Sequence, residues 1–306
     1  MTKVIEADRG FQVWWHLTRP HTLTASFAPV FLGTAIAATI SQHDINFLLF
    51  FAMLMASMLI QAATNMFNEY YDYKLGLDNE NSVGIGGTIV RHGVAPKTIM
   101  MIALSFYGIA LLLGIYICAA SSWWLAVVGL ICMLIGYLYT GGPIPIAYTP
   151  FGELVSGAVM GMGIVLIAFF IQTGTVTWEA VLLSIPSMIL VGGIMLANNI
   201  RDIVGDTEGG RKTMAIIVGR ERAITILSLF FIVSYLWIIG LIIIDDISEW
   251  GLLIVLSLPM PLKAITVFRA HKAPKDVMPA MKYTAQTNTF FVFLLGVGLL
   301  VGHFLS

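Results

Sequence analysis

The chain has 306 residues, of which 58% are hydrophobic and only 11% are charged. A soluble domain carries about 25% charged residues, and the mean hydropathy of this chain is +0.89. This composition excludes a soluble globular protein, a disordered chain and a coiled coil. It also argues against a nucleic-acid binder. The 16 basic and 17 acidic side chains nearly cancel, to a net charge of −1, so their placement matters more than their sum. We expect an all-α, polytopic membrane protein with the lipid bilayer as its solvent.

Nine runs along the chain are long and apolar enough to cross a bilayer as helices, which takes roughly 20 residues each. In chain order they are 22–40, 47–68, 98–118, 122–140, 152–172, 180–199, 223–244, 250–268 and 286–304. Transmembrane strands would instead appear as short segments of alternating polarity. The sequence therefore predicts nine transmembrane helices in a single domain, 1–306.

The charged residues separate by side of the predicted membrane. When the connections between the spans are assigned alternately to the two sides of the membrane, every Lys and Arg lies on or next to the side that holds the N-terminus. The opposite side carries acidic residues alone, at Asp44, Glu179, Asp245, Asp246 and Glu249. Basic connections face the cytoplasm, so we expect a multi-pass protein of the cell membrane with its N-terminus inside and its C-terminus outside.

Two long connections on the cytoplasmic side are rich in Asp, Asn, Arg, Lys and Gly, at about 69–97 and 200–222. At the start of the first, Asn65, Asn68 and Asp72 are spaced i, i+3, i+7. On a helix that continues from the second span, this spacing puts all three on one face. Asp78 follows a short way on.

The second connection repeats this arrangement. Asn198, Asp202 and Asp206 are spaced i, i+4, i+8 and share one helix face, with Asn199 and Arg201 beside it. Asp contributes little to membrane topology, so topology does not explain these residues. Their oxygens suit a hard divalent cation, and Mg²⁺ shares its ligands with substrate phosphates. Two such faces on the same side indicate a functional cluster, provided that the two helices are neighbours.

Basic residues near these faces favour an anion that carries its own metal, such as a diphosphate. They are Lys74, Arg91, Lys97, Arg201, Arg211 and Lys212. For any single lysine among them, topology is the competing interpretation. The stretch Gly84-Ile-Gly86-Gly87 would let backbone N–H groups approach phosphate oxygens, although loop glycines more often serve turns.

A transporter is the alternative from another class of protein. It would place ionisable residues near the bilayer midplane, often on broken helices. Here the acidic residues gather at helix ends on one side, and charges within the spans lie near their boundaries, as at Glu153 and Lys263. This distribution argues against a transporter.

The two oxygen-rich faces resemble the UbiA family of membrane prenyltransferases. The family pattern is NDxxDxxxD after the second span and DxxxD after the sixth. Asn68-Glu69-Tyr-Tyr-Asp72 is similar to the first motif, and Asp202-Ile-Val-Gly-Asp206 matches the second. The resemblance covers essentially the whole chain and implies a UbiA-type bundle of nine helices.

Further segments resemble one branch of that family, the 1,4-dihydroxy-2-naphthoate polyprenyltransferases of menaquinone synthesis in Gram-positive bacilli. They are 17–23, 72–78, 89–93, 139–143 and 198–202. The general pattern has Asp where this chain has Glu69, and it ends on Asp where this chain has Gly76. The naphthoate branch places that last Asp two residues later, as Asp78 does here.

The resemblance implies that a polyprenyl group passes from polyprenyl diphosphate to 1,4-dihydroxy-2-naphthoate, with release of CO₂ and diphosphate, to give demethylmenaquinol. Another aromatic acceptor is the alternative within the family. Mg²⁺ is the implied cofactor, and the residues that would hold it on the diphosphate are Asn68, Asp72, Asp78, Asp202 and Asp206. Of these, Asp72, Asp202 and Asp206 would be the catalytic residues.

The remaining assignments concern the two substrates. The residues that would bind the diphosphate are Lys74, Arg91, Arg201 and Lys212. Candidates for binding the acceptor or stabilising the allylic cation are Arg19, Lys97, Tyr139, Asn65, Asn198 and Asn199. Tyr70, Tyr71 and Tyr137 are further aromatic faces, for which ordinary interfacial packing is an equally good interpretation. No motif reports the prenyl chain length or the oligomeric state.

Overall fold

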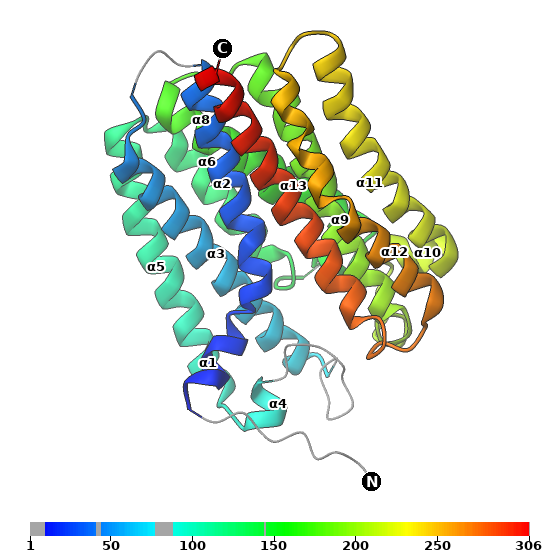
Figure 1. Ribbon diagram of the computed structural model, residues 1–306. Helices are drawn as coiled ribbons and strands as arrows, with labels where there is room; N and C mark the ends of the chain where they lie inside the picture. Colours follow the sequence, from blue (N-terminus) through cyan, green and yellow to red (C-terminus); the bar gives the residue numbers. More distant parts are fainter. Residues whose placement is uncertain (1–9, 41–43, 77–87, 144, 306) are drawn as a thin grey trace.

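The computed structural model describes residues 10–40, 44–76, 88–143 and 145–305. These residues form a bundle of helices with no β-strand among them (Figure 1). Two short helices, α1 (Phe11–Leu17) and α4 (Thr88–His92), lie beneath one end of the bundle, whereas α13 (Met278–Leu305) finishes at the other end. The chain is a multi-pass membrane protein, as its composition predicts.

Eight helical segments are long and apolar enough to cross a membrane, within the part of the chain that the structure describes. They are α2 (Pro20–Ile40), α3 (Phe47–Lys74), α5 (Pro96–Ala120), the segment Gly152–Thr173 that contains α7 (Gly152–Ser156) and α8 (Ile164–Thr173), α9 (Trp178–Glu208), α11 (Arg220–Ile243), the segment Glu249–Ala270 that ends in α12 (Pro259–Ala270), and α13. The short helix α10 (Met214–Val218) joins α9 to α11.

The ninth expected span is shorter than the others. Helix α6 (Trp124–Leu138) has 15 residues, so at 1.5 Å per residue it is about 22 Å long. It is nevertheless strongly apolar, and Trp123 and Trp124 are 64% and 77% exposed at its start, where an interfacial aromatic belt would place them.

The outside of the bundle is apolar, as contact with lipid requires. Large side chains such as Leu112, Leu236 and Ile243 are exposed over most of their surface. A soluble protein rarely exposes apolar patches of this extent. Their distribution over α5 and α11 therefore identifies the lipid-facing surface.

Close packing within the bundle relies on glycine where α9 crosses the segment before α8. This segment is π-helical over Gly157–Gly163, and a Cβ on Gly161 would lie 2.5 Å from the Cα of Met188. Ser187 also donates to the carbonyl of Gly161 at 3.3 Å. Only glycine permits this approach, which locks α9 against its neighbour and fixes where the end of α9 lies.

Candidate functional site

A cavity of about 1850 Å³ runs through the bundle from the ends of α3 and α9 toward Trp123 at the start of α6. Its inner part is apolar and lined by small or aliphatic side chains, among them Ala110, Gly114, Gly129 and Ile164. Its outer part contains every charged residue of the lining. A cavity divided in this way fits a ligand with a long apolar tail and an ionic head.

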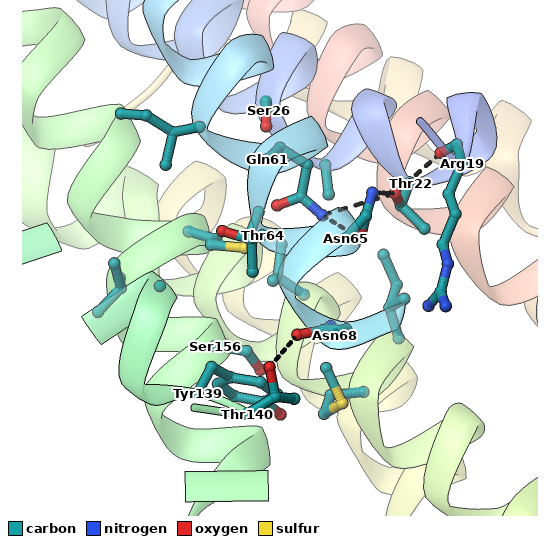
Figure 2. Close-up of a pocket in the computed structure, with 18 of the residues that line it drawn as sticks. Arg19, Thr22, Ser26, Gln61, Thr64, Asn65, Asn68, Tyr139, Thr140 and Ser156 are labelled. Atoms are coloured by element: carbon teal, nitrogen blue, oxygen red, sulfur yellow. Dashed lines mark hydrogen bonds between the residues drawn. The ribbon is translucent and has the colours of Figure 1, made fainter. Parts of the chain in front are cut away.

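The polar face of α3 opens into this cavity, since Asn65, Asn68 and Asp72 all line it. Asn65 is 4% exposed. Its amide donates to Thr22 Oγ1 at 2.9 Å (Figure 2) and to the carbonyl of Thr18 at 3.0 Å. Asn65 therefore fastens α3 to the start of α2.

Asn68, one turn further on, faces the end of α6. Its Oδ1 accepts a hydrogen bond of 2.7 Å from the Thr140 hydroxyl (Figure 2). Tyr139, the residue before Thr140, lines the cavity with an almost buried ring. This contact connects the first motif to Tyr139.

The face of α9 lies opposite, and its four Asn and Asp candidates, Asn198, Asn199, Asp202 and Asp206, also line the cavity. Asn199 donates to the buried Glu153 at 2.9 Å. The Asp202 carboxylate receives two hydrogen bonds from the neighbouring Arg201, at 2.7 and 2.5 Å. The two motifs predicted from spacing therefore face a single cavity.

Arg211 connects these faces. Its guanidinium donates to Asp72 Oδ1 at 2.6 Å and to Asp206 Oδ1 at 3.0 Å, and its centre lies 5.1 Å from the ring centroid of Tyr148. Burial alone would lower the pKa of Arg211, but the adjacent Asp72 and Asp206 raise it above its usual value. The side chain, which is 14% exposed, therefore remains a cation between two carboxylates.

The turn after α9 explains how Arg211 reaches this position. Gly210 has φ +74°, and the backbone N–H groups of Gly210 and Arg211 return to the carbonyls of Thr207 and Asp206, at 3.1 and 2.8 Å. This is the Schellman motif, in which glycine supplies the left-handed residue. It reverses the chain and folds Arg211 back over Asp206.

The other basic candidates divide into two groups. Arg19, Arg91 and Arg201 line the cavity, and Arg19 has φ +50°, a value uncommon outside glycine and more frequent at functional sites. Three lysines are exposed and do not line the cavity, namely Lys74, Lys97 and Lys212.

The remaining candidates do not extend the site. Tyr70, Tyr71 and Tyr137 do not line the cavity, and the last two bond to each other through their hydroxyls at 2.6 Å. Asp78 and the stretch 84–87 lie outside the described residues.

Glu69 points away from the cavity although it lies beside Asn68. It is 1% exposed, and its Oε1 accepts a 3.2 Å hydrogen bond from the backbone N–H of Ile89. Ile89 belongs to α4, which also carries Arg91. Glu69 therefore holds α4 in place, a role that the motif alone did not indicate.

The oxygens at the charged end fit a divalent cation that is shared with a ligand. Asp206 Oδ2 is buried and has no hydrogen-bond partner among the described residues. No three acidic, His or Cys side chains of the described residues are close enough to enclose a metal by themselves. Mg²⁺ is usually held by one or two carboxylates together with substrate phosphates, and the convergence of Asp72 and Asp206 suits that arrangement.

Comparison with known proteins identifies the family of this chain. The model of the UbiA prenyltransferase family matches residues 26–295. The 1,4-dihydroxy-2-naphthoate octaprenyltransferase of Bacillus subtilis is 58% identical over 293 residues, which cover 96% of this chain and 94% of that protein. The protein of the same name from Haemophilus influenzae is 25% identical, over 96% and 98%. The chain belongs to the UbiA prenyltransferase family.

Solved structures share the fold. A UbiA homologue from Aeropyrum pernix K1 has a TM-score of 0.68 at 14% identity, over 92% of this chain and 98% of that one. A UbiA homologue from Archaeoglobus fulgidus, solved with DMAPP and Mg²⁺, has a TM-score of 0.63 at 14% identity, over 93% and 99%. At this identity the likeness establishes the UbiA fold.

Proposed function

We propose that this protein transfers a polyprenyl group from polyprenyl diphosphate to 1,4-dihydroxy-2-naphthoate and so makes demethylmenaquinol for menaquinone biosynthesis. The observation that carries the proposal is the convergence of Asp72, Asp206 and Arg211 at the charged end of an otherwise apolar cavity. The 58% identity to the Bacillus subtilis octaprenyltransferase supports this acceptor.

The reaction has two halves that the cavity keeps together. The bond between the allylic carbon and the diphosphate oxygen breaks, and its electron pair leaves with diphosphate. The ring carbon that bears the carboxylate attacks the allylic carbon and forms the new C–C bond. The bond to the carboxylate then breaks, its electron pair restores the aromatic ring, and CO₂ departs.

The charged end supplies binding and charge stabilisation for the leaving group. Five residues would hold a Mg²⁺–diphosphate complex in this proposal: Asn68, Asp72, Asp78, Asp202 and Asp206. When bound, Mg²⁺ neutralises part of the charge that develops on the leaving diphosphate. Arg211 and Arg91 add positive charge on the same side, and Arg201 orients Asp202 through its paired hydrogen bonds.

The remainder of the cavity protects the allylic cation from water. The prenyl tail fills the inner, apolar part, and exclusion of water strengthens every electrostatic interaction at the charged end. The Tyr139 ring lines the cavity beside the Asn68–Thr140 contact. An aromatic face in this position stabilises a passing cation.

The location of the site matches the properties of both substrates. We infer that the ends of α3 and α9, with the connections 69–97 and 200–222, face the cytoplasm from the cell membrane, because the basic residues gather on that side. The polyprenyl tail dissolves in lipid, while diphosphate and naphthoate are ionic.

Removal of divalent cations is expected to stop prenyl transfer completely. The two carboxylate faces need a cation to bind a diphosphate, because carboxylates and phosphates otherwise repel each other. The measurement is product formation by the purified protein in EDTA, followed by excess Mg²⁺. Transfer that continues in EDTA would rule out the assigned metal ligands.

Glu69→Gln is expected to remain close to wild type, whereas Glu69→Ala raises the KM for polyprenyl diphosphate. Glutamine keeps the acceptor oxygen for the Ile89 N–H, but alanine leaves that buried donor unpaired, at a cost of about 1–3 kcal/mol. Hydrogen exchange at residues 88–92 should accelerate in the alanine variant alone. Equal losses in both variants, with a raised Mg²⁺ requirement, would indicate that Glu69 binds the metal.

The acceptor is tested directly with membranes that contain the protein. A labelled polyprenyl diphosphate is offered with 1,4-dihydroxy-2-naphthoate, 4-hydroxybenzoate or a chlorin. We expect label only in the naphthoate product. Preference for another ring would retain the UbiA chemistry and overturn the proposed acceptor, and no transfer to any ring would overturn the activity.

A further inference from the structure

The polar faces of α3 and α9 form two walls of the charged part of the cavity. A third wall is formed by α12, α13 and the connection between them. Seven basic and four acidic side chains line the cavity. Arg201 and Arg211 are paired with motif carboxylates. Three of the other five cations lie on the third wall and make it a lysine wall, namely Lys263, Lys275 and Lys282. None of these lysines forms an ion pair with a carboxylate of the described residues.

Lys282 lies close to the second motif. The Arg201 guanidinium contacts Met278 Sδ at 3.6 Å, so the first turn of α13 packs against the Arg201–Asp202 pair. Met278 and Lys282 are four residues apart on α13 and therefore share one face, and both line the cavity. Lys282 is thus one helical turn from a residue that touches the motif.

Lys263 faces the same wall from α12. Its Nζ lies 5.7 Å from the ring centroid of Tyr283, and Tyr283 lines the cavity beside Lys282. One ammonium group therefore lies over an aromatic ring of the cavity lining, and a second lysine, Lys282, is the neighbour of that tyrosine in the chain. An aromatic carboxylate complements such a wall, because its ring packs against tyrosine and its charge pairs with lysine.

We propose that Lys263 and Lys282 bind the carboxylate of the aromatic acceptor, an inference that rests on the proposed function. The acidic faces of α3 and α9 repel a free carboxylate, and the inner part of the cavity is suited to the prenyl tail. Arg19 and Arg91 also line the cavity, but Arg19 acts on Asp72 of the first motif and Arg91 is assigned to the diphosphate. The lysine wall is then the side of the cavity that attracts the carboxylate of the acceptor. It also replaces the sequence-based candidate Lys97, which does not line the cavity.

This role predicts an effect on affinity more than on turnover. Pairing with lysine stabilises the carboxylate in the ground state, and the negative charge leaves the carboxylate as CO₂ departs. A contact that weakens toward the transition state contributes to KM and not to kcat. Removing both lysines should therefore raise the KM for the acceptor at least tenfold, with kcat unchanged or slightly higher.

The test measures equilibrium binding to the full-length protein in lipid nanodiscs, with 1-hydroxy-2-naphthoate and 1-naphthol as probes that differ by the carboxylate. The wild type should bind the carboxylate probe at least tenfold more tightly. The double variant Lys263→Gln/Lys282→Gln should lose this preference and keep the KM for polyprenyl diphosphate. Lys272→Gln is the matched control, since Lys272 lies in the connection between α12 and α13, is exposed and does not line the cavity.

Each outcome is decisive. Retained preference in the double variant would overturn the proposal, as would an equal loss in the Lys272→Gln control, which would indicate a general effect of surface charge. The binding measurement requires no turnover. If the wild type prefers the carboxylate probe but does not prenylate 1,4-dihydroxy-2-naphthoate, the lysine site stands and the proposed function fails.

Discussion

Replacement of Asp72 or Asp206 by alanine is expected to lower prenyl transfer by at least about a thousandfold. Each carboxylate contributes to the charged end of the cavity, and removal of one preorganised group that stabilises transition-state charge costs about a hundredfold to a thousandfold. Here the change also leaves Arg211 with a single carboxylate partner, so its guanidinium loses its position as well. The two effects act on the same step, the departure of diphosphate.

The variants that sharpen this prediction keep the shape of the side chain. Asp72→Asn and Asp206→Asn retain an oxygen for Arg211 but remove the charge that binds a cation, so they should be nearly as inactive as the alanine variants. Glu221→Ala is the control, because this carboxylate is 74% exposed and pairs only weakly with Arg220. The measurement is the rate of product formation by purified protein, with membrane insertion checked by fractionation. Full turnover in any of the four Asp variants would refute the metal-site assignment.

Arg211→Met is the second change with a large expected effect. Methionine fills part of the same space without charge, so the buried Asp206 and the mostly buried Asp72 would face each other unpaired. Breaking one partner of a buried ion pair costs about 3–5 kcal/mol, so the thermal midpoint should fall. Transfer should fall by about a hundredfold or more, since a positive group next to the leaving diphosphate is lost.

The neighbouring residue provides the control for this change. Lys212→Met removes the same charge one position later, on a side chain that is exposed and does not line the cavity. We expect it to retain nearly full activity and stability. If Lys212→Met is as inactive as Arg211→Met, the loop acts through its overall charge, and the specific role of Arg211 is wrong.

Helical spacing predicted much of this site. The i, i+3, i+7 pattern of Asn65, Asn68 and Asp72 placed them on one face, and the structure shows that face turned into the cavity. The reason is that an apolar span fixes the direction of its helix. Polar residues at the end of that helix then avoid lipid by facing the interior of the bundle. Eight of the nine expected spans meet the length for crossing a bilayer, whereas α6 has only 15 residues.

Residues whose position depends on turns or on other helices could not be found in this way. Arg211 and Lys212 are equally basic and adjacent, and the Schellman turn at Gly210 decides which one bridges the motifs. The pair Gly209-Gly210 directly before Arg211 was the available signal. Glu69 belongs to the first motif in the sequence, but its carboxylate accepts a hydrogen bond from the backbone of Ile89, twenty residues away.

The lysine wall is a second feature that residue spacing in the sequence could not predict. Lys263 and Lys282 belong to different helices and lie far from either motif in the chain, so no local pattern connects them with Asp202. Their relation to the second motif follows from the packing of Met278 against Arg201. Tertiary contacts alone distinguish these lysines from those that serve topology.

The most direct test of prenyl transfer to the naphthoate uses purified protein in liposomes with polyprenyl diphosphate, Mg²⁺ and 1,4-dihydroxy-2-naphthoate labelled at the carboxyl carbon. We predict that labelled CO₂, diphosphate and the prenylated naphthoquinol appear in equal amounts, and that none of them forms when either substrate is left out. Hydrolysis of the diphosphate without release of labelled CO₂, or a prenylated product that keeps the labelled carboxylate, would contradict the proposed reaction.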